Sequence, residues 1–172
     1  MATILVVVIA ILGVNIYNGR IPYNYKLYTD AEPWIYESYW ENNKVRGAYY
    51  KNPDYNPDED SWGSEDYQDK TSPKTRTVII TDEEAFNEIF KEGDLDVDYS
   101  KEMLILHIFM DVYHPSCYKI TKVTLDKEQV LRIHYKYKDY FAPPGATMPG
   151  QNCFLVKMKK TDVSAVEFVE QR

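Results

Sequence analysis

The chain has 172 residues, a length typical of one domain with some additional sequence. Hydrophobic residues make up 44% of the chain and charged residues 27%, a balance that excludes a fully disordered protein. The formal net charge of −7 argues against nucleic acid as a partner, because nucleic-acid-binding domains are normally basic.

An apolar run, ATILVVVIAILGV, occupies residues 2–14 and weakens toward residue 17. It is short for a bilayer-spanning helix, which needs about 20 residues, and suits the apolar region of a secretory signal. The first basic residues, Arg20 and Lys26, follow the run, an order that the positive-inside rule does not favour for export. We predict that residues 1–17 are a signal or membrane anchor, in contact with the membrane through residues 2–17, with a buried strand as the alternative. The remaining chain would be extracytoplasmic, membrane-anchored or secreted.

Tyrosine and tryptophan dominate the next segment. Residues 17–67 hold ten of the 16 tyrosines and all three tryptophans. These side chains combine an apolar body with a polar tip, which suits half-wet surfaces and interfaces. We expect residues 18–51 to be a Tyr-rich lead-in that packs on the domain or extends from it, with partner or membrane-interface binding as the alternative.

Residues 52–76 carry seven acidic and three basic groups, for a net charge of −4, and almost no aliphatic side chains. Such a segment buries too little apolar area to offset its ordering entropy, so we expect a solvated linker. Its oxygen donors also match positions 1, 3, 5, 7 and 12 of a calcium loop, although Glu59 stands where that loop needs glycine. The candidate calcium ligands are Asp54, Asn56, Asp58, Asp60 and Glu65.

The pattern of regular elements sharpens from residue 77, and residues 77–172 are predicted to form the main domain. We expect a strand at 77–80, and then a helix near 82–92 with Thr81 as its N-cap, Glu84 reaching back to it and Gly93 as its C-cap. Further strands are expected at 103–109, 118–125, 130–137, 153–158 and 163–169, with a tight turn at 126–127. The predicted fold class is α+β, mainly antiparallel β-sheet with one principal helix.

Two features of the second half concern its surface. Lys157, Lys159 and Lys160 alternate with apolar residues, which indicates the solvent face of an edge strand rather than a binding patch. The segment 139–152 has three prolines and two glycines, so it should be an irregular, exposed loop. Because loops carry function more often than the scaffold beneath them, we expect its partner-contact residues to be Tyr140, Phe141, Pro143, Pro144 and Met148.

Three stretches give the chain a likeness to a known family over residues 77–170. The chain enters one strand with DYSKEMLIL from Asp98, another with CYKITKVT from Cys117, and a third with CFLVKMKK from Cys153. This order resembles the C-terminal domain of the protease complex subunit PrcB family, with Tyr118 matching the family's tyrosine and Ser116 and Cys117 replacing its glycines. The resemblance implies an exported bacterial accessory domain that helps or stabilises a partner protease, and it implies no catalytic residue.

The two cysteines leave several readings open. In an exported protein an even cysteine count favours a disulfide, here between Cys117 and Cys153, while two separate buried thiols are the main alternative. The spacing of His114 and Cys117, with His134 and Cys153, is a weak match to a zinc site. A cysteine nucleophile with a histidine base would need the two groups to meet in space.

The predicted function is therefore non-enzymatic. We expect an exported or membrane-anchored accessory domain that binds a protein partner, for which the PrcB likeness suggests a protease, and that needs no cofactor. The alternatives are a calcium-stabilised surface module and an enzyme whose site the sequence does not reveal.

Overall fold

The computed structural model describes residues 24–61, 64–91, 95–138 and 149–171. Its helices are the 3-10 turns η1 (Glu32–Trp34) and η2 (Pro115–Cys117) and the α-helices α2 (Glu37–Asn42) and α3 (Glu83–Ile89). Its strands are β1 (Tyr25–Tyr28), β2 (Tyr49–Lys51), β3 (Asp66–Gln68), β4 (Thr75–Ile80), β5 (Glu102–Asp111), β6 (Tyr118–Leu125), β7 (Val130–Tyr137), β8 (Gly150–Lys159) and β9 (Ala165–Glu170).

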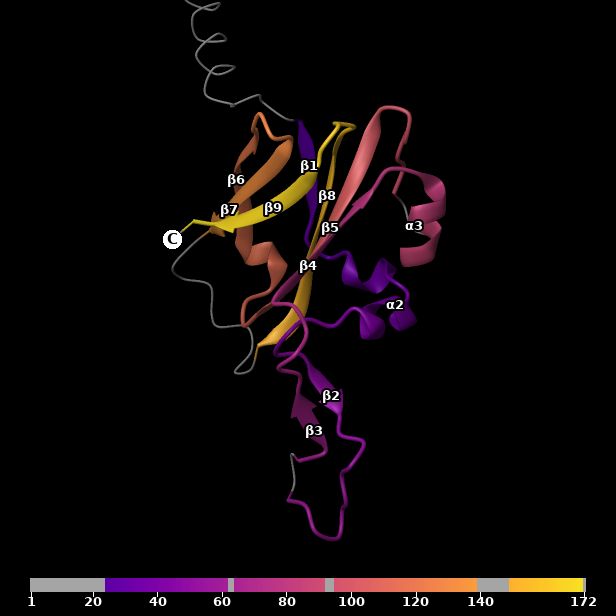
Figure 1. Cartoon of the computed structure of the whole chain (residues 1–172), viewed down its shortest axis with the longest axis vertical. Coiled ribbons are helices and arrows are strands. Elements are labelled where there is room, and N and C mark those ends of the chain that lie inside the picture. Colours follow the sequence, from indigo (N-terminus) through magenta and orange to yellow (C-terminus); the bar gives the residue numbers. More distant parts are fainter. Residues whose placement is uncertain (1–23, 62–63, 92–94, 139–148, 172) are drawn as a thin grey trace, which may run out of the picture.

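The main sheet has four antiparallel strands in the order β1-β8-β5-β4 (Figure 1). Its two central strands carry the continuous apolar runs of the sequence, and both are buried along most of their length. A strand needs such a run when layers cover both of its faces, whereas a strand with one wet face alternates apolar and polar residues.

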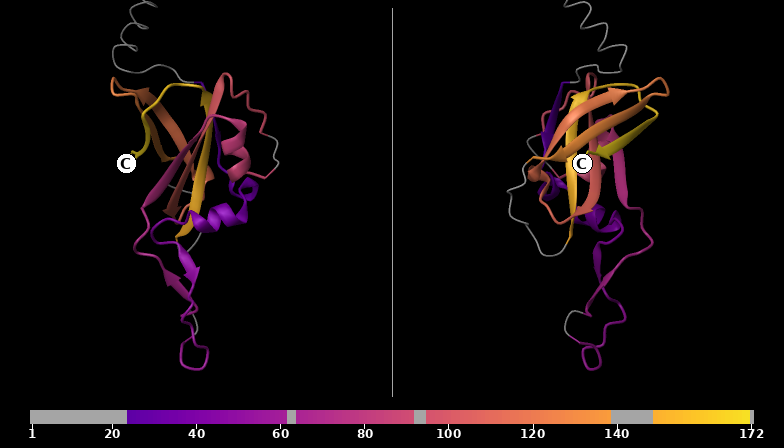
Figure 2. Two further views of the ribbon diagram at one scale, coloured as in Figure 1. Left: turned by 45° about the vertical axis from the view of Figure 1, so that its right-hand side comes forward. Right: turned by 90° about the vertical axis from the view of Figure 1, so that its left-hand side faces the viewer.

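A second sheet of three strands, β6-β7-β9, packs on one face of the main sheet, as the turned views in Figure 2 show. Strands β6 and β7 form the expected antiparallel hairpin, and β9 then runs parallel to β7. The alternating side chains of the hairpin point inward at Ile120, Val123, Leu131 and Ile133, where they meet Met103, Ile105, Val156 and Met158 of the main sheet.

Three of the helices, η1, α2 and α3, cover the opposite face of the main sheet (Figure 2). Their core combines Ile35 and Phe90 with the sheet residues Leu104, Leu106 and Leu155. The architecture is thus helices, sheet and sheet in three layers. It confirms the predicted α+β class, mainly antiparallel sheet with one main helix.

Helix α3 differs from its prediction at both ends. Asp82, not Thr81, is its N-cap, and its carboxylate accepts a 2.9 Å hydrogen bond from the Ala85 amide. The helix ends at Ile89, because Phe90 turns to an extended conformation and forms a β-bridge with Ile35. This bridge buries Phe90 almost completely, so a tertiary contact ends the helix before the expected cap at residue 93, which lies outside the described residues.

The described residues before residue 77 are part of this architecture. Strand β1 pairs with β8 in the main sheet, and β2 pairs with β3 in an arm that projects from the body of the molecule (Figure 1). The acidic segment 52–76 supplies the turns at the end of the arm, strand β3 and the start of β4. Among the described residues no helix is long and apolar enough to cross a bilayer, and the predicted anchor at residues 1–17 lies outside them.

Candidate functional site

The projecting arm presents tyrosine side chains to solvent. Tyr49 on β2 is 36% exposed and Tyr67 on β3 is 45% exposed, the latter stacking on Tyr50 with ring centroids 5.6 Å apart. The Lys44 ammonium lies 4.4 Å from the centroid of the Tyr50 ring. Stacking and the cation–π contact therefore order the rings of Tyr50 and Tyr67, and Tyr67 keeps accessible area, as a side chain at a binding surface must.

The base of the arm is fastened to the body by backbone and side-chain hydrogen bonds. Gly47 has a φ of 95°, a left-handed conformation that glycine adopts without strain, and its amide bonds to the Asp69 carbonyl at 2.9 Å. The Gln151 side chain on β8 accepts a 3.0 Å bond from the Val45 amide and donates to the Trp40 carbonyl. These contacts hold the arm in a fixed direction relative to the main sheet.

Residues 49–69 of the arm carry seven carboxylates and one lysine, a net charge of −6. Two of these carboxylates, those of Asp60 and Asp69, accept hydrogen bonds from turn amides. The Asp60 carboxylate accepts a 2.7 Å bond from the Asn56 amide, and the Asn56 side chain accepts one from the Asp58 amide. In the described part of the chain no group of three or more His, Cys, Asp and Glu residues is placed to hold a metal ion. The structure therefore does not gather the proposed set Asp54, Asn56, Asp58, Asp60 and Glu65 into a calcium site.

A small pocket of about 130 Å³ brings a cysteine and a histidine to one place. It is lined by Cys153, His114, Asp30 and Glu32, among others. The Nδ1 atom of His114 lies 2.8 Å from the Ser116 hydroxyl and accepts from the Ser116 amide, while Nε2 faces the Asp30 carboxylate at 3.5 Å. Both ring nitrogens are thus engaged away from the thiol.

Electrostatics in this pocket also oppose a nucleophilic thiol. Burial raises the pKa of Cys153 to about 12, with nearby Glu32 and Asp30 adding to the shift. Burial likewise raises the pKa of Glu32, which the neighbouring His114 partly offsets. A catalytic cysteine needs a lowered pKa and a free base, so this arrangement favours an inert, protonated thiol.

The structure does not contain the predicted disulfide, since Cys117 and Cys153 are both free thiols. Cys153 lies in the helix-side core with Leu155, whereas Cys117 packs against the aromatic cluster of Phe109, Tyr118 and Phe154 on the other face of the main sheet. Neighbouring residues of a strand point to opposite faces, so the sheet separates the two side chains. The structure thus has two separate thiols, but of the two only Cys153 is buried, whereas the alternative expected both to be.

A buried histidine lies between the two sheets, and sequence reasoning did not single it out. His107 on β5 is 3% exposed, and its Nδ1 lies 2.8 Å from the Thr77 hydroxyl on β4. Its ring stacks on Phe168 of β9 at a centroid distance of 4.0 Å. Burial lowers the pKa of His107 to about 3, so the ring is neutral at physiological pH.

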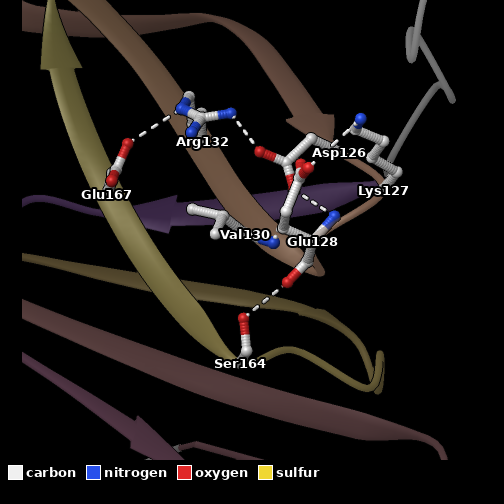
Figure 3. Close-up of polar contacts among 7 residues, drawn as sticks. All are labelled: Asp126, Lys127, Glu128, Val130, Arg132, Ser164 and Glu167. Carbon is white, nitrogen blue, oxygen red and sulfur yellow. Dashed lines mark hydrogen bonds and ion pairs between the residues drawn. The ribbon is translucent and has the colours of Figure 1, made fainter.

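A polar cluster closes the β6–β7 hairpin and positions β9 (Figure 3). The turn takes four residues rather than the expected two, and its last residue, Gln129, has a φ of 60°. The Asp126 carboxylate accepts bonds from the Val130 amide and from Arg132, and Arg132 also donates to Glu167 of β9 at 2.8 Å. This cluster joins a local turn to a strand 35 residues away, which makes its role structural.

A surface cleft of about 1000 Å³ lies at the end of the main sheet where β1 begins. Its walls include Lys157, Lys159 and Lys160. The expectation that these lysines mark an edge strand is wrong for Lys157, which is paired with β1 on one side and with β5 on the other. Lys159 is paired with β5 alone, and Lys160 follows the end of β8. The proposed contact residues Tyr140, Phe141, Pro143, Pro144 and Met148 lie outside the described residues, so their role stays a prediction.

Comparison of the chain with protein-family models, with curated protein sequences and with solved structures found no match. The likeness of residues 77–170 to the PrcB family therefore stays a prediction.

Proposed function

We propose that this chain is a non-enzymatic accessory domain, exported or membrane-anchored, that binds another extracytoplasmic protein. The PrcB likeness suggests a protease as the partner, which the domain would assist or stabilise. The observation that carries the proposal is the projecting arm, in which exposed tyrosines stand beside a dense negative charge.

The chemistry of the arm suits a protein surface. Tyrosine is enriched at interfaces because it contributes a large contact area with few rotatable bonds and can still hydrogen-bond. Tyr49 and Tyr67 supply that area, and the net charge of −6 over residues 49–69 favours a cationic partner. Charge of one sign on a protruding element also speeds association with an oppositely charged surface.

The position of the arm supports the same reading. It projects from the end of the main sheet opposite the start of β1, the first described strand after the apolar run (Figure 1). An anchor at residues 2–17 would thus leave the arm on the side of the domain that faces away from the bilayer.

A comparative pull-down from the envelope of cells that produce the protein tests this function. The full chain is used as bait beside the double variant Tyr49→Ser/Tyr67→Ser and the control Tyr36→Ser, whose side chain is 40% exposed on the body of the domain. We expect a protein that the wild type and the control retain and the arm variant loses. Its retention should also weaken between 0.1 and 0.5 M salt, because added salt screens the charge of the arm.

Two results would contradict the proposal. One is equal retention of every recovered protein by the wild type and the arm variant, and the other is recovery of no stable partner at all. Circular dichroism of each variant must first show that the fold is retained, since loss of the Tyr50–Tyr67 stack costs about 0.5–1.5 kcal/mol.

A further inference from the structure

The cleft at the end of the main sheet contains an unusual placement of lysines. Lys157 and Lys159 lie on the face of β8 that also carries Leu155, and Lys26 of β1 is directly opposite Lys157. The face that the helices cover farther along the strand thus changes from apolar to cationic at this end. Lysines on an exposed edge strand prevent aggregation, but β8 is paired on both sides at Lys157, so that explanation does not apply to this residue.

The pairing of Lys26 with Lys157 also opposes stability. Residues directly opposite on neighbouring strands have Cβ atoms about 5 Å apart, and like charges in such a pair destabilise the sheet. Lys157 is partly compensated, since its ammonium donates to the Asp96 carbonyl at 2.8 Å and to the Glu102 carboxylate at 3.2 Å. Lys26 has a cation–π contact, with its ammonium 4.6 Å from the centroid of the Tyr28 ring, but it meets no carboxylate among the described residues. A sequence keeps such a conflict most readily where a ligand resolves it.

The cleft as a whole has more positive than negative groups. Three carboxylates stand against five lysines, for a net charge of +2. Lys101 pairs with Asp98 at 2.7 Å, and Lys160 donates to the backbone carbonyls of Thr81 and Tyr99. Carbonyl oxygens leave the charge of an ammonium uncompensated. The five lysines are Lys26, Lys101, Lys157, Lys159 and Lys160.

The cleft lies close in sequence to the predicted membrane anchor. Asn24 and Tyr25 form part of its wall, only seven residues beyond the apolar run that ends at residue 17. Seven residues span at most about 25 Å when fully extended. If residues 2–17 enter a bilayer, the cleft therefore lies within about 25 Å of the headgroups, at the end of the domain opposite the arm (Figure 1).

We propose that this lysine cleft binds the anionic lipid headgroups of the membrane to which the chain is attached. The proposal rests on the membrane attachment within the proposed function, but not on the partner protein. Lysines close to an anionic leaflet each favour binding by about fivefold, and the attraction fades within a Debye length. The cleft would orient the domain with β1 toward the bilayer and the arm away from it.

Vesicle flotation with the full chain, diluted from mild detergent, tests the proposal. The vesicles are phosphatidylcholine alone or phosphatidylcholine with 30% phosphatidylglycerol. We expect the wild type to prefer the anionic vesicles, and the variant Lys26→Gln/Lys159→Gln to lose roughly 30-fold of that preference, the product of two lysines. The matched control is Lys119→Gln/Lys136→Gln, an exposed lysine pair opposite each other on β6 and β7, which should keep the preference.

The flotation results distinguish a failure of the lysine cleft from a failure of the membrane anchor. Equal preference in the wild type and the cleft variant would overturn the proposal, and so would competition by 10 mM inorganic phosphate, which would point to a small-anion site. If the wild type fails to float with neutral vesicles, the membrane anchor is refuted, but a difference between the wild type and the cleft variant on anionic vesicles would still support the cleft. Should the double variant misfold, Lys159→Gln alone tests the same site, with an expected loss of about fivefold.

Discussion

The neutral histidine between the two sheets makes the stability of the fold depend on pH. Within the described part of the chain His107 has no carboxylate partner; its neighbours there are the Thr77 hydroxyl and the rings of Phe109, Phe154 and Phe168. The perturbation we choose is the double variant His107→Phe/Thr77→Val. It keeps an aromatic ring in the stack and removes the hydroxyl that would otherwise lose its partner. Thr77→Val alone is the control, because it retains the histidine.

The size of the stability loss follows from the pKa of His107 in the folded state and its pKa in the unfolded chain. The pKa is about 3 in the folded state and 6.5 in the unfolded chain, so between these values only the unfolded state binds the proton. The contribution of His107 to stability is fully present above pH 6.5 and is lost as the pH falls toward 3. At pH 4.5, two units below the unfolded pKa, the loss is about 2.7 kcal/mol at 1.36 kcal/mol per unit.

Urea unfolding followed by far-UV circular dichroism at pH 7.5 and pH 4.5 measures this loss. Acid also weakens the fold through carboxyls such as Asp69, whose pKa its hydrogen bonds with Ser72 and Thr71 hold below the usual value. That contribution is common to all variants and cancels in the comparison. We expect the free energy of unfolding to fall by about 2.5 kcal/mol less in the double variant than in the Thr77→Val control. Equal decreases in the two proteins would refute the account of a buried, neutral His107.

Other consequences of the structure can be measured on the same protein. Thiol titration of the unfolded chain, purified without reductant, should find two thiols; finding none would restore the Cys117–Cys153 disulfide. Calcium at 1 mM should leave the melting temperature unchanged, whereas a site with a Kd of about 10 μM would add about 2.7 kcal/mol. Gly47→Ala should lower the free energy of unfolding by about 1–2 kcal/mol, because alanine is strained at the φ of 95°. An unchanged urea midpoint would contradict this. Asp126→Ala should lower the urea midpoint more than Glu167→Gln does, because two turn amides lose their acceptor, whereas Glu167→Gln weakens one exposed ion pair; equal effects would contradict the structural role of the cluster in Figure 3.

The sequence predicted those parts of the fold whose pattern is local. The apolar runs of β5 and β8 and the alternation along β6 and β7 gave strands in the right places, because burial on two faces or on one leaves a direct trace in the order of residues. The end of α3 was predicted wrongly because a distant residue decides it. Ile35 pairs with Phe90 across 55 positions of sequence, and no local cap signal reports such a bridge.

The candidate sites were harder to predict for the same reason. The alternation of Lys157 and Lys159 with apolar residues is visible in the sequence, but its meaning depends on whether a strand pairs on each side of β8. Strand β1 supplies one of those partners, and it comes from a Tyr-rich segment with no clear strand pattern. His107 likewise appeared to be one more residue of an apolar strand, until the second sheet placed Phe168 against its ring.

The two ends of the molecule differ in charge in a way that a uniform surface would not produce. Residues 49–69, at the arm, carry a net charge of −6, whereas the cleft beside the start of β1 carries +2, and the main sheet separates them. A domain held near an anionic bilayer by its first strand gains from positive charge at that end. The field of the bilayer fades within about 8 Å at physiological ionic strength, so it acts on the cleft end alone, and attraction there turns the tyrosines outward. The proposed lipid contact and the proposed protein contact thus require the same orientation of the domain, although each is tested by separate variants.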